Sequence, residues 1–428
     1  MRSRRFLLPF LSALALATAI SASAKTADEL AVEAVSSDST TSSTAIRELR
    51  EMGPAGLDVL FAKYSNEIDA YGKTGDDTDD WKRIAKALDT VAMQYDSYAA
   101  HLYWYTDLDA AKRAAKAQHK PILSLRLLGN LNEEFSCANS RLFRAILYPN
   151  EQISNYLHDH YILHWKSVRP APRITIDFGD GRKIERTITG NPIHYILSED
   201  GDVIDAVPGL YSPAEFMAYL TGADAMNAQL RTIPFAQRVT AMMKFRKDNF
   251  DRIIAARDTA VAKAGVKLTE PKAGTIAINA APMAMAKAVV VDEYRILRVY
   301  DDFAKYEPAI KFDDWVKLAR IYAPDLKIDQ STVRFVRRQN AKTGLSEAEF
   351  TTLFKKIDDF VALDTTRNHY LFHTKIYQWL NEGKGNMDLE DLNAAVYDEI
   401  FQTPNYDKWL GLYSPDVYTA LDGNGIIR

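Results

Sequence analysis

The chain has very little cysteine and no excess of charge of either sign. Cys137 is the single cysteine among 428 residues, so a framework of intrachain disulfides is excluded. Lys and Arg number 53 against 57 Asp and Glu, which gives a net charge of -4. Because bulk nucleic-acid binding usually requires a basic surface, we expect no nucleic-acid partner.

Long apolar runs are also lacking beyond the first 24 residues, so no membrane span is expected. The N-terminus itself has the features of a cleavable export signal. A basic start with Arg4 and Arg5 precedes an apolar stretch at residues 6–20, and the small residues up to Ala24 suit cleavage. We therefore expect residues 1–24 to be a signal peptide and the mature chain, from about Lys25, to be periplasmic or secreted.

Motifs for cofactors and metal ions are missing as well. The sequence has no phosphate-binding glycine loop, dinucleotide fingerprint or nucleophile elbow. His158, His160 and His164 lie close in sequence, but a helix end and a strand would not make them converge. His369 and His373 have the four-residue spacing that suits zinc, yet no further ligand is evident nearby, and a structural role is favoured. No cofactor and no metal site are therefore expected.

The lone cysteine lies on a turn between a predicted strand and a predicted helix. An apolar run at residues 121–127 predicts a buried strand, and apolar residues with helical spacing follow Cys137. On such a turn, free backbone N–H groups and the helix dipole favour thiolate over thiol. Arg141 adds positive charge nearby, whereas Glu133 and Glu134 act in the opposite direction. A reactive sulfur and a buried, inert one both remain open.

The order of elements around this turn resembles the thioredoxin superfamily, in particular its exported members. Trp104, a helix at residues 108–118 capped by Thr106 or Asp107, Lys120-Pro121 and the strand precede the cysteine turn. The predicted elements that follow are a helix at 150–158, strands at 161–168, 193–197 and 203–206, and a closing helix at 213–220. The resemblance implies a thioredoxin-like α/β domain at residues 104–222, with a mixed sheet, flanking helices and an inserted β-hairpin at residues 173–188.

The resemblance also implies a site. The family's redox motif is Cys-x-x-Cys, whereas this chain has Cys-Ala-Asn-Ser at residues 137–140. The cysteine suits the first attack on a disulfide, but Ser140 cannot resolve the mixed disulfide that results. By analogy with the family, Asn191 and Pro192 would line the substrate site, and the bond before Pro192 would be cis. Arg141 is a further candidate for substrate binding, because its positive charge is expected near the sulfur.

Three functions are compatible with this sequence. The first is a monothiol protein that uses Cys137 and Ser140 in thiol–disulfide exchange or mixed-disulfide capture, with protein thiols or a small thiol as partners. The second is a non-enzymatic binding or scaffold protein with a degenerate thioredoxin fold, whose helices bind a protein partner. The third is a peroxidase-like activity through a sulfenic acid. An enzyme requires an accessible Cys137 that faces a cis Pro192, whereas a scaffold tolerates a buried sulfur.

Helical patterns flank the central domain on both sides. Residues 25–103 predict an N-terminal helical region. Its lead-in up to residue 45 is expected to be flexible, with room for a short helix at residues 27–35, and a unit around Gly53-Pro54 resembles a single HEAT-type repeat. Residues 223–428 predict an all-α domain of about six helices. The predicted fold class is therefore α+β, with several domains.

Overall fold

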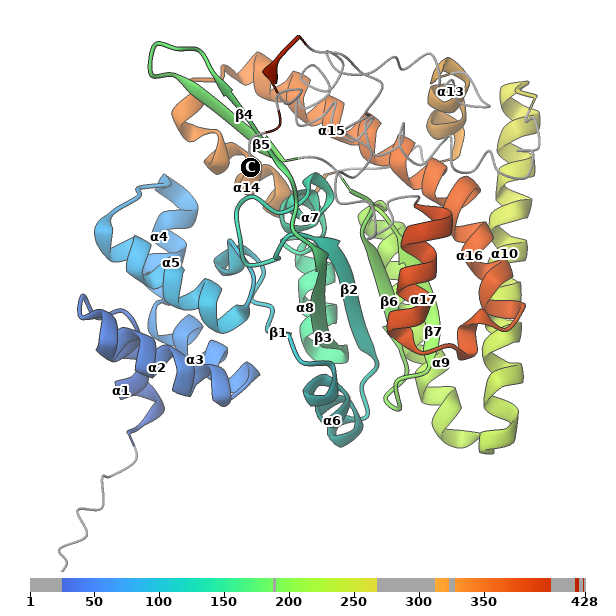
Figure 1. The fold of residues 1–428 in the computed structure, drawn as a ribbon, viewed down its shortest axis with the longest axis horizontal. Coiled ribbons are helices and arrows are strands. Elements are labelled where there is room, and N and C mark those ends of the chain that lie inside the picture. Colours follow the sequence, from blue (N-terminus) through green and yellow to red (C-terminus); the bar gives the residue numbers. More distant parts are fainter. Residues whose placement is uncertain are drawn as a thin grey trace, which may run out of the picture.

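The computed structural model describes residues 25–187, 190–267, 312–322, 328–401, 420–422 and 426. The predicted signal peptide and residues 268–311 of the predicted C-terminal helical domain lie outside these ranges. A five-stranded mixed sheet is surrounded by helices, which makes the fold mixed α/β (Figure 1). Within the described ranges, no helix combines the length and the apolar character that crossing a membrane requires.

The sheet has the strand order β1-β3-β2-β6-β7. Strands β1 (Trp104–Tyr105), β3 (Ile162–Arg169) and β2 (Ile122–Leu128) run parallel to one another. Strand β6 (Ile193–Leu197) pairs antiparallel with β2, and β7 (Val203–Pro208) pairs antiparallel with β6. Every residue of the central strand β2 is buried, which explains why its sequence is almost continuously apolar.

Helices connect and cover these strands as the sequence predicts. They are α6 (Leu108–Gln118) between β1 and β2, then α7 (Ala138–Leu142), the π-helical segment η2 (Phe143–Leu147) and α8 (Glu151–His160) between β2 and β3, and α9 (Pro213–Thr232) after β7. Asp107 caps α6 by accepting a hydrogen bond from Ala110 N at 2.6 Å. The predicted hairpin forms a separate antiparallel pair, β4 (Arg173–Asp177) and β5 (Lys183–Thr187).

The two faces of the sheet pack against different helices. On one face, Arg126 of β2 donates a hydrogen bond to Glu390 at 2.8 Å, on helix α17 (Leu389–Ala395). His194 of β6 lies opposite Leu125 in the ladder, so its side chain is on the other face. There it forms a hydrogen bond of 2.8 Å with Tyr148, the residue after η2.

The N-terminal helices have a hydrophobic cluster of their own. They are α1 (Ala27–Ala34), α2 (Ser39–Glu51), α3 (Pro54–Lys63), α4 (Ser65–Thr74) and α5 (Asp79–Ala92), followed by the short 3-10 segment η1 (Ser97–Ala99). The short helix predicted at residues 27–35 is confirmed as α1, whereas the flexible lead-in around it is wrong, because residues 39–45 form the start of α2. Asp38 caps that helix by accepting from Thr41 N at 2.8 Å, and Ile46 and Leu49 bury its apolar face.

Up to residue 401, the described ranges of the C-terminal part contain helices and no strand, as predicted. Its elements are α10 (Phe235–Ala264), α13 (Phe312–Tyr322), α14 (Gln330–Gln339), η4 (Ala341–Thr343), α15 (Glu347–Arg367), η5 (Asn368–His373), α16 (Thr374–Asn381), η6 (Lys384–Asn386), α17 and η7 (Val396–Ile400). Helix α9 runs through the predicted boundary at residue 222. One buried cluster contains residues of the sheet and of these helices together, so the C-terminal part completes the core of the sheet.

Two buried histidines, one on each face of the sheet, are expected to make the protein unstable in mild acid. Burial lowers the pKa of both His164 and His194 to about 3, from an ordinary value of 6.5, and the charge of Arg126 contributes at His164. Below pH 6.5 the unfolded chain binds protons that the folded chain excludes, so the free energy of unfolding decreases as the pH falls towards 3. The loss at pH 5 is about 2 kcal/mol for each histidine.

Urea unfolding at about pH 7.5, 6 and 5 measures this loss. In the double variant His164→Asn with His194→Gln, an amide replaces each imidazole near its hydrogen-bonding nitrogen and does not titrate, so the pH dependence should become weaker. Asp89 acts with the opposite sign, because burial and the nearby Asp96 raise its pKa to about 7. Asp89→Asn is therefore expected to steepen the loss in acid. An unchanged pH dependence in the double variant would contradict the assignment to the histidines.

Candidate functional site

The structure places the predicted site residues on two neighbouring turns. Cys137 is the N-cap of α7, and its backbone N–H donates to the carbonyl of Leu128, the last residue of β2, at 3.1 Å. Asn139 Nδ2 donates to the carbonyl oxygen of Gly190 at 2.6 Å. The cysteine turn therefore contacts the turn that carries Asn191 and Pro192, as the sequence leads us to expect.

The hydroxyl of Ser140 is engaged with oxygen acceptors. Its Oγ lies 2.6 Å from Ser136 Oγ and 2.8 Å from the carbonyl oxygen of Cys137, and these two oxygens are the acceptors within reach of its single proton. The sulfur of Cys137 lies 3.6 Å from Ser140 Oγ, with the thiol as donor. Ser140 thus accepts from the thiol and directs its own proton away from the sulfur. These hydrogen bonds connect residues of the first turn of α7 with one another.

Cys137 is fully buried, with none of its surface exposed. It belongs to the same buried cluster as Val396, Tyr397 and Ile400 of η7. Burial raises the pKa of Tyr397 well above its ordinary value, and the neighbouring Cys137 adds to the effect. Tyr397 of η7 therefore lies near the cysteine turn, and the sulfur presents no exposed surface to a disulfide or peroxide in this conformation.

The predicted cis bond before Pro192 is wrong, because the described residues contain no cis peptide bond. Pro192 leads directly into the extended strand β6. Its carbonyl accepts a hydrogen bond from Gly209 N at 2.8 Å, which continues the antiparallel pairing of β6 and β7. The trans bond fits this extended path, and the family feature expected to place the proline opposite the cysteine is absent.

Arg141 connects the cysteine turn with the hairpin. Its guanidinium donates to Thr187 Oγ1 at 3.1 Å, and the Thr187 hydroxyl donates to the carbonyl of Ser136 at 3.0 Å. Thr187 is the last residue of β5, so the hairpin lies beside the cysteine turn, as expected from its place in the sequence. The guanidinium that was predicted to bind substrate thus forms a hydrogen bond within the protein.

Two buried polar networks between the sheet and the C-terminal helices were not found from the sequence. Arg126 is 1% exposed and donates to Ser124 at 2.7 Å and to Glu390 at 2.8 Å. Asp205 of β7 is fully buried and accepts from the Tyr377 hydroxyl at 2.9 Å. The arginine within an apolar strand was a local signal for the first network. The network of Asp205 has no local signal in the sequence, because its partners lie far apart along the chain.

The histidines that the sequence singled out have structural partners. His369 lies between the hydroxyls of Tyr219 and Tyr322, at 2.6 and 2.7 Å, and His373 Nε2 lies 3.1 Å from Asp205 Oδ1. The other three do not converge, since His158 pairs with Asp159, His160 with Asp224, and His164 with Ser124. The structural interpretation of His369 and His373 is supported by these buried hydrogen bonds.

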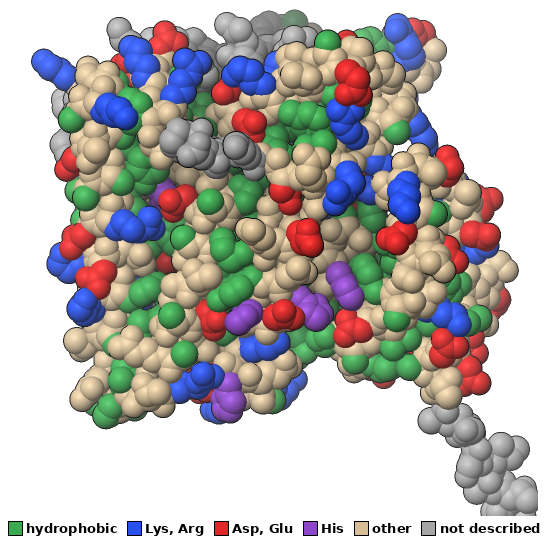
Figure 2. All heavy atoms as spheres, turned by 180° about the vertical axis from the view of Figure 1, so that it is seen from behind, with side chains coloured by type: hydrophobic (Ala, Val, Ile, Leu, Met, Phe, Trp, Pro, Cys, Tyr) green, Lys and Arg blue, Asp and Glu red, His purple; other side chains and the backbone are tan. Residues whose placement is uncertain are grey.

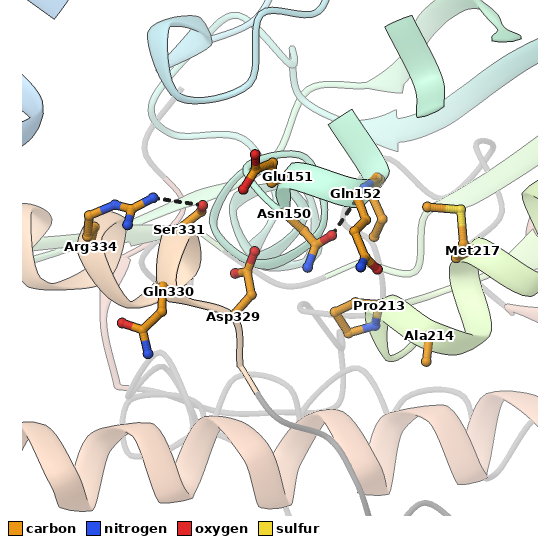
Figure 3. A pocket seen from close by; sticks show the side chains of 11 residues that line it. Asn150, Glu151, Gln152, Pro213, Ala214, Met217, Asp329, Gln330, Ser331 and Arg334 are labelled. Atoms are coloured by element: carbon orange, nitrogen blue, oxygen red, sulfur yellow. Dashed lines mark hydrogen bonds between the residues drawn. The ribbon is translucent and has the colours of Figure 1, made fainter. Parts of the chain in front are cut away.

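A cavity of about 390 Å³ lies where the starts of α8, α9 and α14 meet (Figure 3). Asn150 and Asp329 line it, and each already caps its own helix through a backbone N–H. Arg334 donates to Ser331 at 3.0 Å, and the carboxylate of Glu151 adds negative charge. Because these groups serve their own helices, we assign the cavity no ligand.

The predicted site is thus a buried junction and not an open cleft. None of its five residues lines any of four cavities of about 280 to 460 Å³ among the described residues. Its hydrogen bonds connect the cysteine turn with the hairpin and with the proline turn. No protein-family model matches the chain, and comparisons with curated proteins and with solved structures find no similar protein.

Proposed function

We propose that the chain is an exported, non-enzymatic binding or scaffold protein with a degenerate thioredoxin-like core, in which Cys137 is a packing residue. The observation that carries this proposal is the complete burial of the sulfur in a cluster with residues of η7. A thiolate nucleophile must be reached by the disulfide or peroxide it attacks. The trans Pro192 and the bonded Arg141 also favour a structural junction.

The thioredoxin-like core is supported by the sheet and its connections. Three parallel strands are followed by two antiparallel ones in the order β1-β3-β2-β6-β7, which is the strand arrangement of the thioredoxin fold. The cysteine lies at the N-cap of the first helix after the central strand β2. Export is proposed because residues 1–24 have the sequence features of a signal peptide. In a binding protein of this kind, the flanking helices would contact the partner.

A monothiol protein is the second candidate. It is favoured by the place of Cys137 at the start of α7, with Ser140 Oγ 3.6 Å from the sulfur. Thiol–disulfide exchange and peroxide chemistry at this position both require the C-terminal helices to move away from the cysteine turn. The two candidates therefore differ in whether the folded protein exposes its thiol.

Alkylation of the folded, mature chain distinguishes them. We expect iodoacetamide to label Cys137 only after denaturation in urea, because the sulfur is enclosed, with Cys137→Ser as the blank. Ala55→Cys in the Cys137→Ser background places a thiol on the exposed side of α3 and should react in the folded state. Labelling of folded wild type as fast as this control would contradict the scaffold proposal and favour the monothiol.

A further inference from the structure

Two imidazoles and a carboxylate meet where helix α3 approaches helix α8. Asp58 lies on α3, His101 follows η1, and His158 lies on α8. The Nε2 atoms of His101 and His158 lie 2.9 and 3.7 Å from the same oxygen, Asp58 Oδ1. The three ligand atoms all lie within 4.8 Å of one another. Histidine and acidic side chains gather on the face drawn in Figure 2.

The residue types suit a zinc-like ion. Imidazole nitrogen and carboxylate oxygen are ordinary ligands of Zn²⁺, with bonds of about 2.0 to 2.2 Å, so ligand atoms in such a site lie roughly 3 to 4 Å apart. Small side-chain rotations bring the present atoms into that range. The three side chains are 40–49% exposed, so an ion can enter and a further position stays open to water.

The surroundings hold both imidazoles in a ligating orientation. His158 Nδ1 lies 2.9 Å from the Asp159 carboxylate, the outer contact that metal-bound histidines commonly make, and this leaves Nε2 facing Asp58. The ring of His101 stacks on Phe61, with centroids 3.7 Å apart. At 3.7 Å from the carboxylate, His158 Nε2 is too distant for a hydrogen bond with it.

We propose that Asp58, His101 and His158 bind a divalent transition-metal ion with the ligand preferences of Zn²⁺. A hydrogen bond of Asp58 with His101 alone does not account for the second imidazole, whereas a shared ion engages all three groups. Because Asp58 belongs to the N-terminal helices and His158 to α8, the ion ties the N-terminal helices to the body that carries the sheet. The site is independent of Cys137 and of its reactivity.

The test is Zn²⁺ binding to the tag-free mature chain, measured by equilibrium dialysis and by thermal unfolding with Zn²⁺ or with EDTA. We expect about one ion per chain and a rise in melting temperature that EDTA reverses. His158→Ala and His101→Asn should each weaken binding by about 100-fold or more, and Asp159→Asn by about 10- to 100-fold. Asparagine is chosen at position 101 because its φ is +50°, a conformation that asparagine tolerates.

His160→Ala is the matched control, because His160 lies on the same helix and pairs with Asp224 instead. It should bind Zn²⁺ as wild type does. Unfolding of every variant in EDTA shows whether its fold is intact, and the absorption bands of bound Co²⁺ report nitrogen and oxygen ligands in a low-symmetry site. No retained Zn²⁺ in wild type, or equal binding by wild type, His101→Asn and His158→Ala, would overturn the proposal.

Discussion

Asp205→Ala is expected to lower the free energy of unfolding by about 4 kcal/mol. Asp205 is fully buried on β7, where its carboxylate accepts from Tyr377 and from Ala206 N and lies 3.1 Å from His373 Nε2. Alanine removes every acceptor at once and leaves the polar atoms of His373 and Tyr377 without this partner, away from water. Such orphaned buried groups each cost roughly 1 to 3 kcal/mol.

Urea unfolding of Asp205→Ala and wild type at neutral pH measures the difference. Asp248→Ala on α10 is the control, because that carboxylate is exposed and pairs with Lys244 one turn away. It should unfold at nearly the wild-type urea concentration. A loss for Asp205→Ala no larger than that of the control would show that the buried network does not hold the C-terminal helices in place.

The same variant connects stability with the proposed function. Asp205 forms hydrogen bonds with His373 of η5 and Tyr377 of α16. Further along the same helical part, η7 belongs to the buried cluster that contains Cys137. If these helices enclose the sulfur, loosening them should increase alkylation of Cys137 at urea concentrations below the global transition. Faster labelling without loss of the sheet would mean that the thiol is gated by the helices, which is what the monothiol candidate requires.

Local patterns predicted the central elements well. The strand at residues 121–127 and the helix at 108–118 were set by an apolar run, by Asp107 as cap and by the Lys120-Pro121 break, all within one short segment. The prediction of a flexible segment around Ser39 failed because its serine and threonine residues are typical of linkers. There, Asp38 as cap and the later apolar residues of α2 decide the outcome.

Long-range packing accounts for what the sequence did not predict. Cys137 lies in one buried cluster with residues of η7, and the position of η7 in the sequence gives no hint of this. Asp58, His101 and His158 come from three separate segments of the chain, so no spacing rule unites them. The cis bond before Pro192 was carried over from a family, whereas the strand pairing of this chain sets the trans form.

Gly56→Ala is expected to be nearly as damaging as the loss of Asp205, although it adds only one methyl group. A Cβ at position 56 would lie 1.9 Å from the carbonyl oxygen of Leu49 and 2.7 Å from its carbonyl carbon. These are backbone atoms of α2, so no side chain can move aside, and α3 must shift away from its buried neighbour. We expect a loss of about 3 kcal/mol, at the upper end of the cost of overpacking.

Gly72→Ala on α4 is the matched control, because a Cβ there meets no atom within 4 Å. It should stabilise the chain by about 0.5 to 1 kcal/mol through helix propensity. Unfolding in urea compares the two variants, and equal stabilities would contradict the close contact of α2 and α3. Asp58 lies on α3, two residues after Gly56, so a shifted helix also moves it away from His101 and His158. Weaker Zn²⁺ binding in Gly56→Ala, with unchanged binding in Gly72→Ala, would show that the proposed metal site depends on the packing of α2 against α3.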